Sequence, residues 1–366
     1  MTNILTAHNL LIQRGGKPIF CLEELAIRDG EVLALIGPNG VGKSTLLLTL
    51  AQIIQPLSGD LIFCNKTLDL KKTLTYRRRI AIMLQDPLLL HSSVFDNVAT
   101  GLRFRGIPKE QIEDRVMNWL NRLGINHLRD RSAQRLSGGE AQRVSMARSM
   151  VLNPEILFLD EPFRALDAPT RARLLADFRT LQTDVSMTTV MVTHDLDEAL
   201  LLADRVAIIL EGGLRQCDSP EKVFNSPSDA DVADFVGVET ILPGRVVSSK
   251  AGHTTVDVDG FLLEVIGETR VDQDVLFCLR PEDITLWVAK DLPLSSARNH
   301  LEGEVQSILP QGPLMRISVR CQRRKSKRSF DVNAFITRTS AQEMGIDVGK
   351  KIHLTFKASA AHCIPR

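Results

Sequence analysis

The stretch GPNGVGKST, residues 37–45, decides the fold of this 366-residue chain. It fits the pattern G-x-x-x-x-G-K-[S/T], whose glycines allow backbone N–H groups to converge on a phosphate. The apolar run EVLALIG (31–37) precedes it, and STLLLTLAQII (44–54) continues from it. This order predicts a buried strand, a phosphate-binding turn and a helix whose N-terminus favours an anion. A glycine-rich strand-to-helix turn without a ligand is the alternative, and the flanking pattern disfavours it.

The residues of this turn have separate expected roles toward a nucleotide. We expect Lys43 to reach the β- and γ-phosphate oxygens and Ser44 to ligate Mg²⁺. The residues of the turn that we expect to contact the nucleotide are Gly37, Asn39, Gly40, Gly42, Lys43, Ser44 and Thr45.

Further apolar runs predict more strands of a mostly parallel sheet, buried on both faces. They are EILFLD (155–160), TTVMVTH (188–194) and RVAIIL (205–210). Asp160 ends the first of these runs, and at the carboxyl end of a strand it can hold Mg²⁺ through water. Glu161 follows it and can orient or deprotonate an attacking water molecule. An acidic turn that caps a helix is the alternative for this pair.

Polar residues also follow two other strands. His194 ends the run at 188–194, beside the expected phosphate site, and is a candidate contact for the γ-phosphate. Asp195 and Glu198 fit a D-x-x-E cap for the next helix, so we expect structural roles for them. Gln85 follows the run IAIML at 80–84 and is a candidate sensor of the metal and the attacking water. Taken alone, His194 would be an ordinary histidine and Gln85 a surface glutamine.

A second glycine pair occurs in RLSGGEAQR (135–143). Ser137 and Glu140 form the S-x-x-E pattern of a capping box, which starts a helix. The stretch is therefore either only a well-capped helix start or, in addition, an exposed anion site at Ser137, Gly138 and Gly139.

The chain is expected to divide into two domains. Residues 1–236 are predicted to form an α/β nucleotide-binding domain with a helical subdomain at about 86–153. Within this insertion, KEQIEDRVMNWLNRLGI (109–125) has its apolar residues at helical spacing. Residues 237–366 are predicted to form an all-β domain of tandem five-stranded, OB-like barrels.

A weak internal repeat supports the two barrels. LPGRVVS (242–248) and LEGEVQS (301–307) share the pattern L-x-G-x-V-x-S, and each precedes another strand-like run. The basic stretch RRKSKR (323–328) lies between two of the expected strands. A solvated hairpin loop or a nucleic-acid patch can both account for it, and a single short run favours the loop.

Composition excludes several classes of protein. The net charge is +1, which provides no general attraction to nucleic acid or to an anionic membrane. No apolar run approaches the roughly 18 residues that span a bilayer, and the N-terminal stretch lacks the pattern of a secretory signal. Six cysteines without a C-x-x-C pair indicate reduced thiols in a cytosolic protein. Any role at a membrane is therefore expected to depend on a partner.

Together these motifs resemble those of ATP-binding cassette (ABC) transporter ATPases, over about residues 4–235. The matching segments are, in order, GPNGVGKST, Gln85, LSGGEAQR, ILFLDEP, ALD and VTHD. In that family two cassettes pair head to tail, and the LSGG-type loop of one closes over the ATP held by the other. The resemblance implies ATP and Mg²⁺ as cofactors and a homodimer in which Ser137, Gly138 and Gly139 contact the ATP of the second subunit.

The same resemblance implies partners at a membrane. It implies permease subunits that span the membrane and a periplasmic or extracellular substrate-binding protein, with no nucleic acid. The expected location is the cytoplasmic face of the inner membrane, where dimer closure drives the permease.

Two positions depart from the family pattern. An aromatic residue that stacks on adenine usually precedes the phosphate-binding turn, and here Arg14 occupies that position, with Phe20 somewhat later. An arginine can stack on a purine face, so we expect altered but retained base binding. The family usually has a serine before ALD, whereas this chain has Arg164, an added cation at the junction of two subunits. Neither departure removes a catalytic residue, so we expect active ATP hydrolysis.

The C-terminal part resembles the small molybdate-binding (TOBE/Mop) domain of molybdate and tungstate importer ATPases, at about 295–364. SSARNHLEGEV (295–305) and the run at 336–363 carry this resemblance. Hydroxyl groups and cations suit a tetrahedral dianion. The candidate oxyanion ligands are therefore Ser296, Arg298, Lys357 and Ser359. The alternative for each is that it caps a strand.

The leading hypothesis is the ATPase subunit of a molybdate or tungstate importer, whose barrel domain senses the imported oxyanion and arrests import. One alternative is an importer ATPase for sulfate, iron or polyamine. A second is a sensor of ATP and oxyanion that does not power transport. A third is a cassette ATPase that acts on nucleic acid, for which only 323–328 argues.

Overall fold

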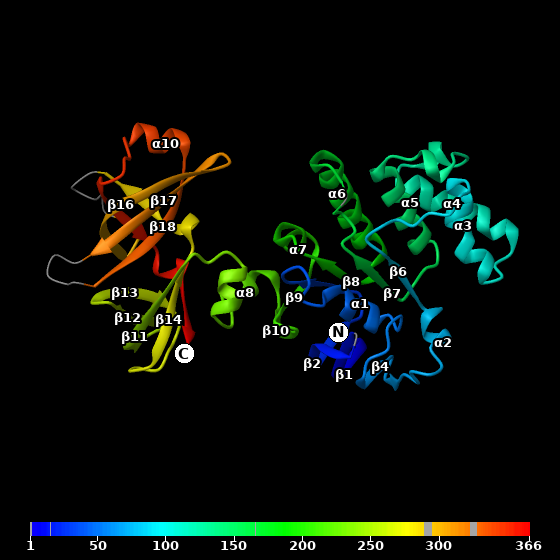
Figure 1. Ribbon diagram of the computed structural model, residues 1–366, viewed down its shortest axis with the longest axis horizontal. Helices are drawn as coiled ribbons and strands as arrows, with labels where there is room; N and C mark the ends of the chain where they lie inside the picture. The colour runs from blue at the N-terminus through cyan, green and yellow to red at the C-terminus, as the bar shows by residue number, and fades with distance from the viewer. Residues whose placement is uncertain (1, 15, 165, 289–294, 323–327) are drawn as a thin grey trace. The chain divides into compact units, whose positions relative to one another are not determined.

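The computed structural model describes residues 2–14, 16–164, 166–288, 295–322 and 328–366 (Figure 1). It contains two compact units, Met1–Pro220 and Glu221–Arg366, and each is described by itself. The domain boundary expected after residue 236 stays a prediction. No helix within the described ranges is long and apolar enough to cross a membrane.

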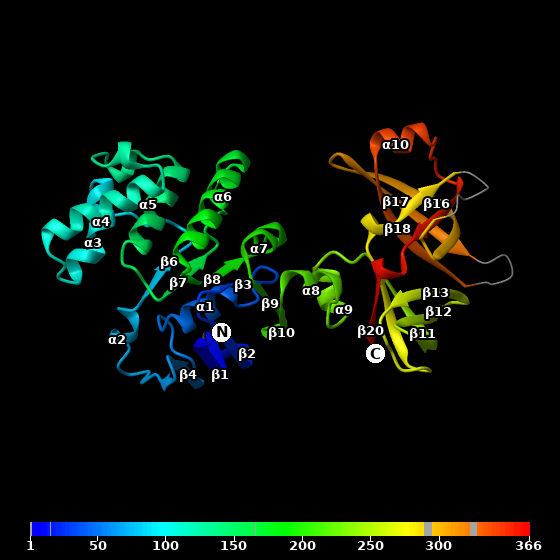
Figure 2. The same ribbon diagram turned by 180° about the vertical axis from the view of Figure 1, so that it is seen from behind.

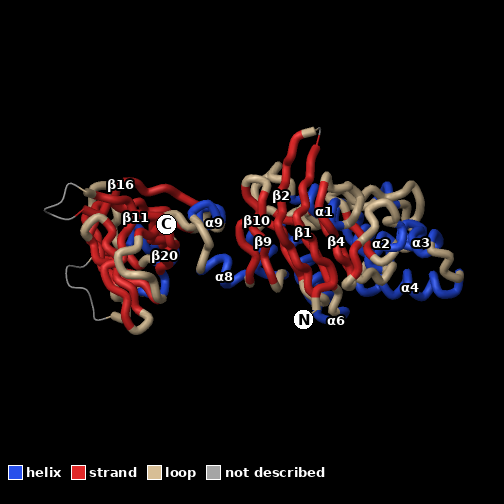
Figure 3. Tube along the Cα trace, turned by 90° about the horizontal axis from the view of Figure 1, so that it is seen from below, coloured by secondary structure: helices blue, strands red, loops and turns tan. Residues whose placement is uncertain are grey.

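A ten-stranded sheet forms the described framework of the first unit, in the order β5-β4-β1-β2-β10-β9-β3-β8-β7-β6. Its strands are β1 (Asn3–Arg14), β2 (Lys17–Arg28), β3 (Val32–Ile36), β4 (Ser58–Phe63), β5 (Lys66–Thr67), β6 (Ile80–Met83), β7 (Ile156–Asp160), β8 (Thr188–Thr193), β9 (Arg205–Leu210) and β10 (Gly213–Asp218). Strands β9, β3, β8, β7 and β6 pair in parallel. Strands β1, β2 and β4 pair antiparallel and lie side by side (Figure 3).

The parallel strands confirm the runs that the sequence predicted as buried. Every residue of β3, β7 and β8 is buried. The register brings the carboxyl ends of neighbouring strands level, with Ile36 opposite Thr193, Asp160 opposite Val192 and Met83 opposite Leu159. Side chains that follow these strands therefore meet at one edge of the sheet.

Seven α-helices are described in the first unit. They are α1 (Lys43–Leu50), α2 (Leu74–Arg77), α3 (Val94–Phe104), α4 (Lys109–Arg122), α5 (Gly138–Met150), α6 (Ala168–Val185) and α7 (Leu196–Leu202), with short 3-10 turns η1 (Asn126–Leu128) and η2 (Ala133–Arg135). Helices α3, α4 and α5 gather beside the β6 and β7 edge of the sheet (Figure 1, Figure 2). This group is the helical insertion that the sequence predicted between two strands.

Helix α4 shows why the insertion folds. Ile112, Val116 and Leu120, at helical spacing, are buried as predicted. Trp119 is half-buried, and the guanidinium of Arg122 lies 5.4 Å from its ring centroid. The apolar stripe of α4 thus packs inward while its cations remain at the surface.

The second unit is an all-β fold with short helices. Its elements are α8 (Pro220–Asn225), α9 (Ala230–Phe235), β11 (Thr240–Lys250), β12 (His253–Val258), β13 (Phe261–Ile266), β14 (Asp274–Leu279), η3 (Pro281–Asp283), β15 (Thr285–Trp287), β16 (Asn299–Gln311), β17 (Leu314–Gln322), β18 (Ser329–Thr337), α10 (Arg338–Glu343), β19 (Lys351–Phe356), η4 (Ala358–Ala360) and β20 (Ala361–Pro365). The described strands form two five-stranded sheets, β13-β12-β11-β14-β20 and β15-β19-β16-β17-β18. The predicted fold class, an α/β cassette followed by OB-like barrels, is confirmed.

The two sheets exchange strands, which the sequence did not predict. Strand β20 at the end of the chain completes the first sheet beside β14, and β15 from the first half joins the second sheet beside β19. Side chains from both sheets share one hydrophobic cluster, in which Phe277 and Phe356 pack with ring centroids 6.1 Å apart. The barrels are therefore interlocked and do not simply follow one another along the chain.

The internal repeat corresponds to equivalent positions in the two sheets. The L-x-G-x-V-x-S segments lie in β11 and β16, each flanked by two strands of its sheet. In each strand a bulge follows the valine, at Val246 and at Val305. A Cβ added to Gly244 would lie 2.6 Å from Val256, and one added to Gly303 would lie 2.5 Å from Val319. The repeated glycine therefore lets a cross-strand valine pack against the backbone.

We expect Gly303→Ala to destabilise the second unit by about 1–3 kcal/mol, the usual cost of overpacking. The chain has two tryptophans, so a Trp119→Phe background leaves Trp287 as the single reporter of this unit. The measurement is urea unfolding followed by Trp287 fluorescence. An unchanged unfolding midpoint for Gly303→Ala would contradict the packing role of this glycine.

Candidate nucleotide-binding site

The phosphate-binding turn is shaped by two glycines. A Cβ at Gly37 would lie 2.1 Å from the carbonyl oxygen of Ile209, so only glycine fits where the turn passes β9. Gly42 has φ 102° and is the N-cap of α1, a backbone conformation that a side chain disfavours. Its carbonyl accepts the N–H of Leu46 across 2.8 Å, which starts the helix. The turn is therefore a tight strand-to-helix connection that ends at the N-terminus of α1.

Lys43 lies inside this turn. Its Nζ donates to the carbonyl oxygens of Gly37 and Pro38, each 2.8 Å away. Burial lowers the pKa of Lys43, while the nearby carboxylates of Glu161 and Asp160 oppose the shift. The ammonium is thus held at the turn by backbone carbonyls.

Ser44 and Asp160 meet across the site. The Ser44 hydroxyl donates to Asp160 Oδ1 across 2.8 Å, although the two residues come from α1 and the end of β7. Burial raises the pKa of Asp160, and the hydrogen bond from Ser44 partly offsets that shift. A hydroxyl and a carboxylate at this separation fit Mg²⁺, which keeps waters and phosphate oxygens as its other ligands.

Glu161 has an unusual backbone conformation. Its φ is 44°, in the left-handed region, which costs on the order of 1–3 kcal/mol for a residue with a side chain. The Glu161 N–H donates to the carbonyl of Val192 across 3.0 Å, and this hydrogen bond holds the turn in place. Its carboxylate lies 3.3 Å from His194 Nδ1 and 2.8 Å from Arg164 Nη1. The structure thus brings together Glu161 and His194, as expected, and adds Arg164.

The segment after His194 is tied down by α6. Asp195 accepts the N–H of Glu198, as the predicted helix cap requires. The Glu198 side chain does not return to complete a capping box but accepts from Thr193 and from Arg171. Arg171 pairs with both Asp195 and Glu198. Sequence reasoning missed Arg171, because its partners are distant in the chain and their D-x-x-E pattern predicts only a helix cap.

Glu161, Arg164 and His194 border a small cavity of about 60 Å³. The remaining lining residues are Arg171, Thr193 and Glu198. This volume corresponds to roughly two water molecules. The cavity can therefore place a water molecule against the Glu161 carboxylate.

Gln85 lies two residues beyond β6. Because Met83, the last residue of β6, is opposite Leu159, Gln85 follows β6 at the edge of the sheet where Asp160 ends β7. Its half-buried side chain is at the same edge of the sheet as the metal-ligand candidates. Asn39 and Gly40 are exposed, and Thr45 is half-buried at the start of α1.

The structure provides no adenine contact at either of the two expected positions within the described residues. Arg14 ends β1, where its backbone is opposite Lys17, but its side chain lies outside the described part of the chain. Phe20 is 2% exposed and belongs to the core beneath the turn. Phe20 therefore cannot stack on a base, since both ring faces are covered.

The predicted capping box is present at the start of α5. The Glu140 N–H donates to Ser137 Oγ across 3.3 Å, and the Ser137 N–H donates to the Glu140 carboxylate across 2.7 Å. Ser137 and Gly138 are exposed, whereas Gly139 packs against Thr170. The backbone at this helix start is therefore exposed at Ser137 and Gly138.

Two of the four oxyanion candidates line a common cavity in the second unit. Lys357 and Ser359 border a cavity of about 280 Å³ together with Arg280 and His362. Burial lowers the pKa of His362, so its ring is neutral at neutral pH. Asp283 also lines the cavity, and burial raises the pKa of its carboxyl.

The other two candidates lie elsewhere in the second unit. Ser296 is exposed and, like Arg298, is not a lining residue of this cavity within the described ranges. Arg298 pairs with Glu264 across 3.3 Å. The basic stretch at 323–328 lies outside the described residues except for Arg328, which is near Asp259.

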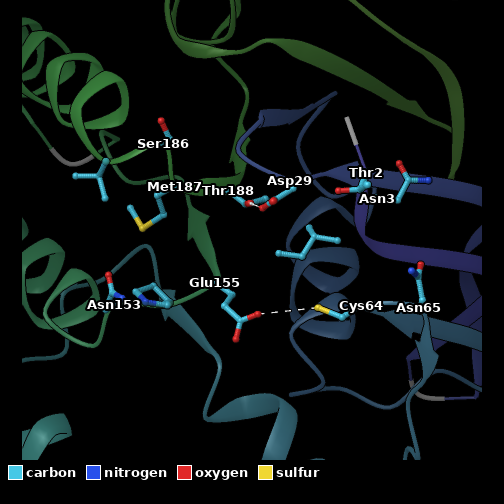
Figure 4. A pocket seen from close by; sticks show the side chains of 13 residues that line it. Thr2, Asn3, Asp29, Cys64, Asn65, Asn153, Glu155, Ser186, Met187 and Thr188 are labelled. Atoms are coloured by element: carbon cyan, nitrogen blue, oxygen red, sulfur yellow. Dashed lines mark hydrogen bonds between the residues drawn. The ribbon is translucent and has the colours of Figure 1, made fainter.

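A further cavity, of about 550 Å³, opens at the opposite end of the parallel strands (Figure 4). Its lining includes Glu155 just before β7 and Thr188 at the start of β8. The Cys64 thiol points toward Glu155 there, with the sulfur 4.0 Å from the carboxylate. Because it lies at the amino ends of the strands, this cavity is separate from the phosphate-binding edge.

Comparison with known proteins agrees with this geometry. Residues 23–164 match the family model described as ABC transporter, and residues 295–363 match the TOBE domain. A molybdate/tungstate import ATP-binding protein, WtpC of Pyrococcus horikoshii, is 36% identical over 94% of this chain and 96% of its own length. A spermidine/putrescine import ATP-binding protein, PotA of Spiroplasma citri, is 34% identical over 88% of this chain and 90% of its own length.

A solved structure shares the fold. CbiO1 of Clostridium perfringens, part of the ABC transporter complex CbiONQ, is 34% identical, with a TM-score of 0.58 over 62% of this chain and 92% of its own. The match with WtpC covers more than nine-tenths of the chain, and the family models include the phosphate-binding turn, the paired carboxylates and the barrel domain. The chain therefore belongs to the ATP-hydrolysing subunits of ABC importers.

Proposed function

We propose that this subunit energises the import of molybdate or tungstate. The observation that carries the proposal is the 36% identity over nearly the whole length to proteins named for molybdate/tungstate import, in P. horikoshii and in Pyrococcus abyssi. The cation and hydroxyl in the second-unit cavity, Lys357 and Ser359, support it, because they suit a tetrahedral dianion.

A polyamine importer is the second candidate. Proteins named for spermidine/putrescine import reach 35% identity over most of their length, close to the molybdate/tungstate relatives. The cavity chemistry favours the anion, because a polyamine is a polycation and Lys357 and Arg280 would repel it. Asp283 is the group in the cavity that a polyamine would favour.

Hydrolysis in this proposal uses the residues at the strand ends. Lys43 donates to the β- and γ-phosphate oxygens, and Glu161 accepts the proton of the attacking water or orients it. His194, whose Nδ1 lies 3.3 Å from Glu161, contacts the γ-phosphate, and Gln85 orients the water from the segment after β6. Mg²⁺, held by Ser44, Asp160 and Gln85, would supply positive charge against the phosphate oxygens.

A second copy of the chain would complete each site. The start of α5 is exposed at Ser137 and Gly138, and backbone amides at a helix start bind anions. We expect Ser137, Gly138 and Gly139 to contact ATP held by the other subunit of a homodimer. ATP would then join the two subunits, and hydrolysis would separate them.

The proposed setting is peripheral, at the cytoplasmic face of the membrane, on permease subunits that receive substrate from an extracytoplasmic binding protein. The second unit would bind imported oxyanion and arrest further import. Such feedback requires only that the oxyanion binds the arrested state better than the active one.

Glu161→Gln tests the proposed catalytic role. Loss of the base should reduce ATP turnover by about 10²–10⁴-fold and leave an ATP-bound dimer. Phosphate release and light scattering after size-exclusion chromatography measure the two effects. Glu113→Gln, which removes an exposed carboxylate paired with Arg129, serves as the control. A variant that stays monomeric with ATP would argue against shared sites.

The pH dependence of Mg²⁺-ATP binding tests Asp160. Because burial raises the pKa of Asp160, protonation should remove this ligand at a higher pH than for an ordinary aspartate. We expect Mg²⁺-dependent affinity for a fluorescent ATP analogue to fall as the pH is lowered from 7 toward 5. Asp160→Asn should give weak binding with a flat profile in that range. A wild-type profile that is equally flat would exclude Asp160 as the titrating ligand.

Titration of the full-length chain separates the substrates. Calorimetry with molybdate, tungstate, sulfate and spermidine should show binding of the first two. Lys357→Ala should weaken that binding about tenfold, the loss of one charge-assisted hydrogen bond, whereas Lys351→Ala, an exposed lysine of β19, should not. Binding of sulfate alone would overturn the molybdate/tungstate assignment, and binding of spermidine alone would establish the second candidate.

A further inference from the structure

Arg164 forms a close ion pair with the proposed catalytic base. Its Nη1 lies 2.8 Å from Glu161 Oε2, and its backbone N–H donates to the Glu161 carbonyl across 3.3 Å. The other carboxylate oxygen, Oε1, faces His194 Nδ1. Each oxygen of Glu161 is thus engaged by a different neighbour, and the guanidinium occupies the one away from His194.

The two members of this pair differ strongly in exposure. The Glu161 side chain is 8% exposed, whereas the Arg164 side chain is 46% exposed. The carboxylate is therefore fixed in the interior, while the arginine reaches it from the surface. A charged partner stabilises a buried carboxylate. An exposed guanidinium loses little free energy when it moves to another acceptor.

The second arginine of the cavity is not available for this role. Arg171 pairs with both Asp195 and Glu198. Among the described residues, Glu161 is the one carboxylate that pairs with Arg164. Of the two arginines that line the cavity, Arg164 is therefore the one that can move to another acceptor without breaking a network of ion pairs such as that of Arg171.

A γ-phosphate would compete with Glu161 for this guanidinium. The cavity that Arg164 and Glu161 border lies at the phosphate-binding edge, and the Arg164 charge acts on Lys43 within the turn. A phosphate group carries more negative charge than a carboxylate and accepts a guanidinium bidentately. ADP has no γ-phosphate and would leave the ion pair with Glu161 intact.

We propose that Arg164 is a positioning residue that holds Glu161 while the γ-phosphate position is empty and transfers to the γ-phosphate when ATP binds. The transfer releases the Glu161 carboxylate to position water. Glu161 can therefore act as the base only when the γ-phosphate that is to be cleaved is present. This inference rests on the proposed catalytic role of Glu161.

Discrimination between ATP and ADP tests the transfer. Fluorescent-nucleotide displacement is measured on the full-length chain in EDTA, which prevents turnover. Arg164→Ser should weaken ATP binding about three- to tenfold and change ADP binding less than twofold, and Arg164→Lys should recover part of the loss. Arg103→Ser, which breaks an exposed 2.8 Å pair with Asp96, is the matched control and should change neither. Equal losses for ATP and ADP would indicate a merely structural role and overturn the proposal.

A double-mutant comparison tests the competition itself. In a Glu161→Gln background the guanidinium has no carboxylate to leave, so Arg164→Ser should cost more ATP affinity there than in the wild type. An equal cost in the two backgrounds would overturn the switch. If Glu161→Gln keeps normal turnover, the proposed role of Glu161 fails. If it abolishes turnover but Arg164→Ser leaves the ATP-to-ADP ratio unchanged, the inference about Arg164 fails alone.

Discussion

The hydrogen bond from Ser44 to Asp160 joins residues 116 positions apart in the chain across 2.8 Å. It forms only because β8 lies between β3 and β7 with the carboxyl ends of all three strands level. The same alignment places His194 beside Glu161 and Gln85 near the same edge. A shift of one residue in either pairing would turn these side chains to the other face of the sheet. The whole nucleotide site therefore depends on the register of these parallel strands.

At the carboxyl ends of the parallel strands, negatively and positively charged side chains lie close together. Two carboxylates, Asp160 and Glu161, are less than one-tenth exposed beside the equally buried Lys43. Burying such charges costs free energy unless each has partners, and the shifted pKa values of Lys43 and Asp160 record that cost. Arg164 contributes the added positive charge from the surface. In the proposed mechanism a triphosphate with its divalent cation replaces several of these contacts, which couples ligand binding to release of the base.

The second unit shows a different constraint. Its two sheets exchange β15 and β20 and share one core, so neither sheet is complete without a strand from the other half of the sequence. The cavity beside Lys357 has lining residues from the α8 region, β14 and η4. A ligand in this cavity would therefore contact segments from both ends of the unit, which suits the proposed sensing role.

The sequence by itself predicted the buried parallel strands, the helix start at Ser137 and a set of candidate nucleotide-site residues. Apolar runs marked the buried strands, because burial on both faces demands continuous apolar side chains, and local hydrogen bonding explains why Ser137 and Glu140 predicted a helix start. The sequence could not show that Phe20 is buried or that Glu161 has a left-handed backbone. It also could not show that Arg164 and Arg171 form ion pairs with different carboxylates. It also could not show that Lys357 and Ser359 share a cavity from which Ser296 and Arg298 are separate. These features depend on contacts between distant segments, and only the tertiary structure decides which distant segments meet.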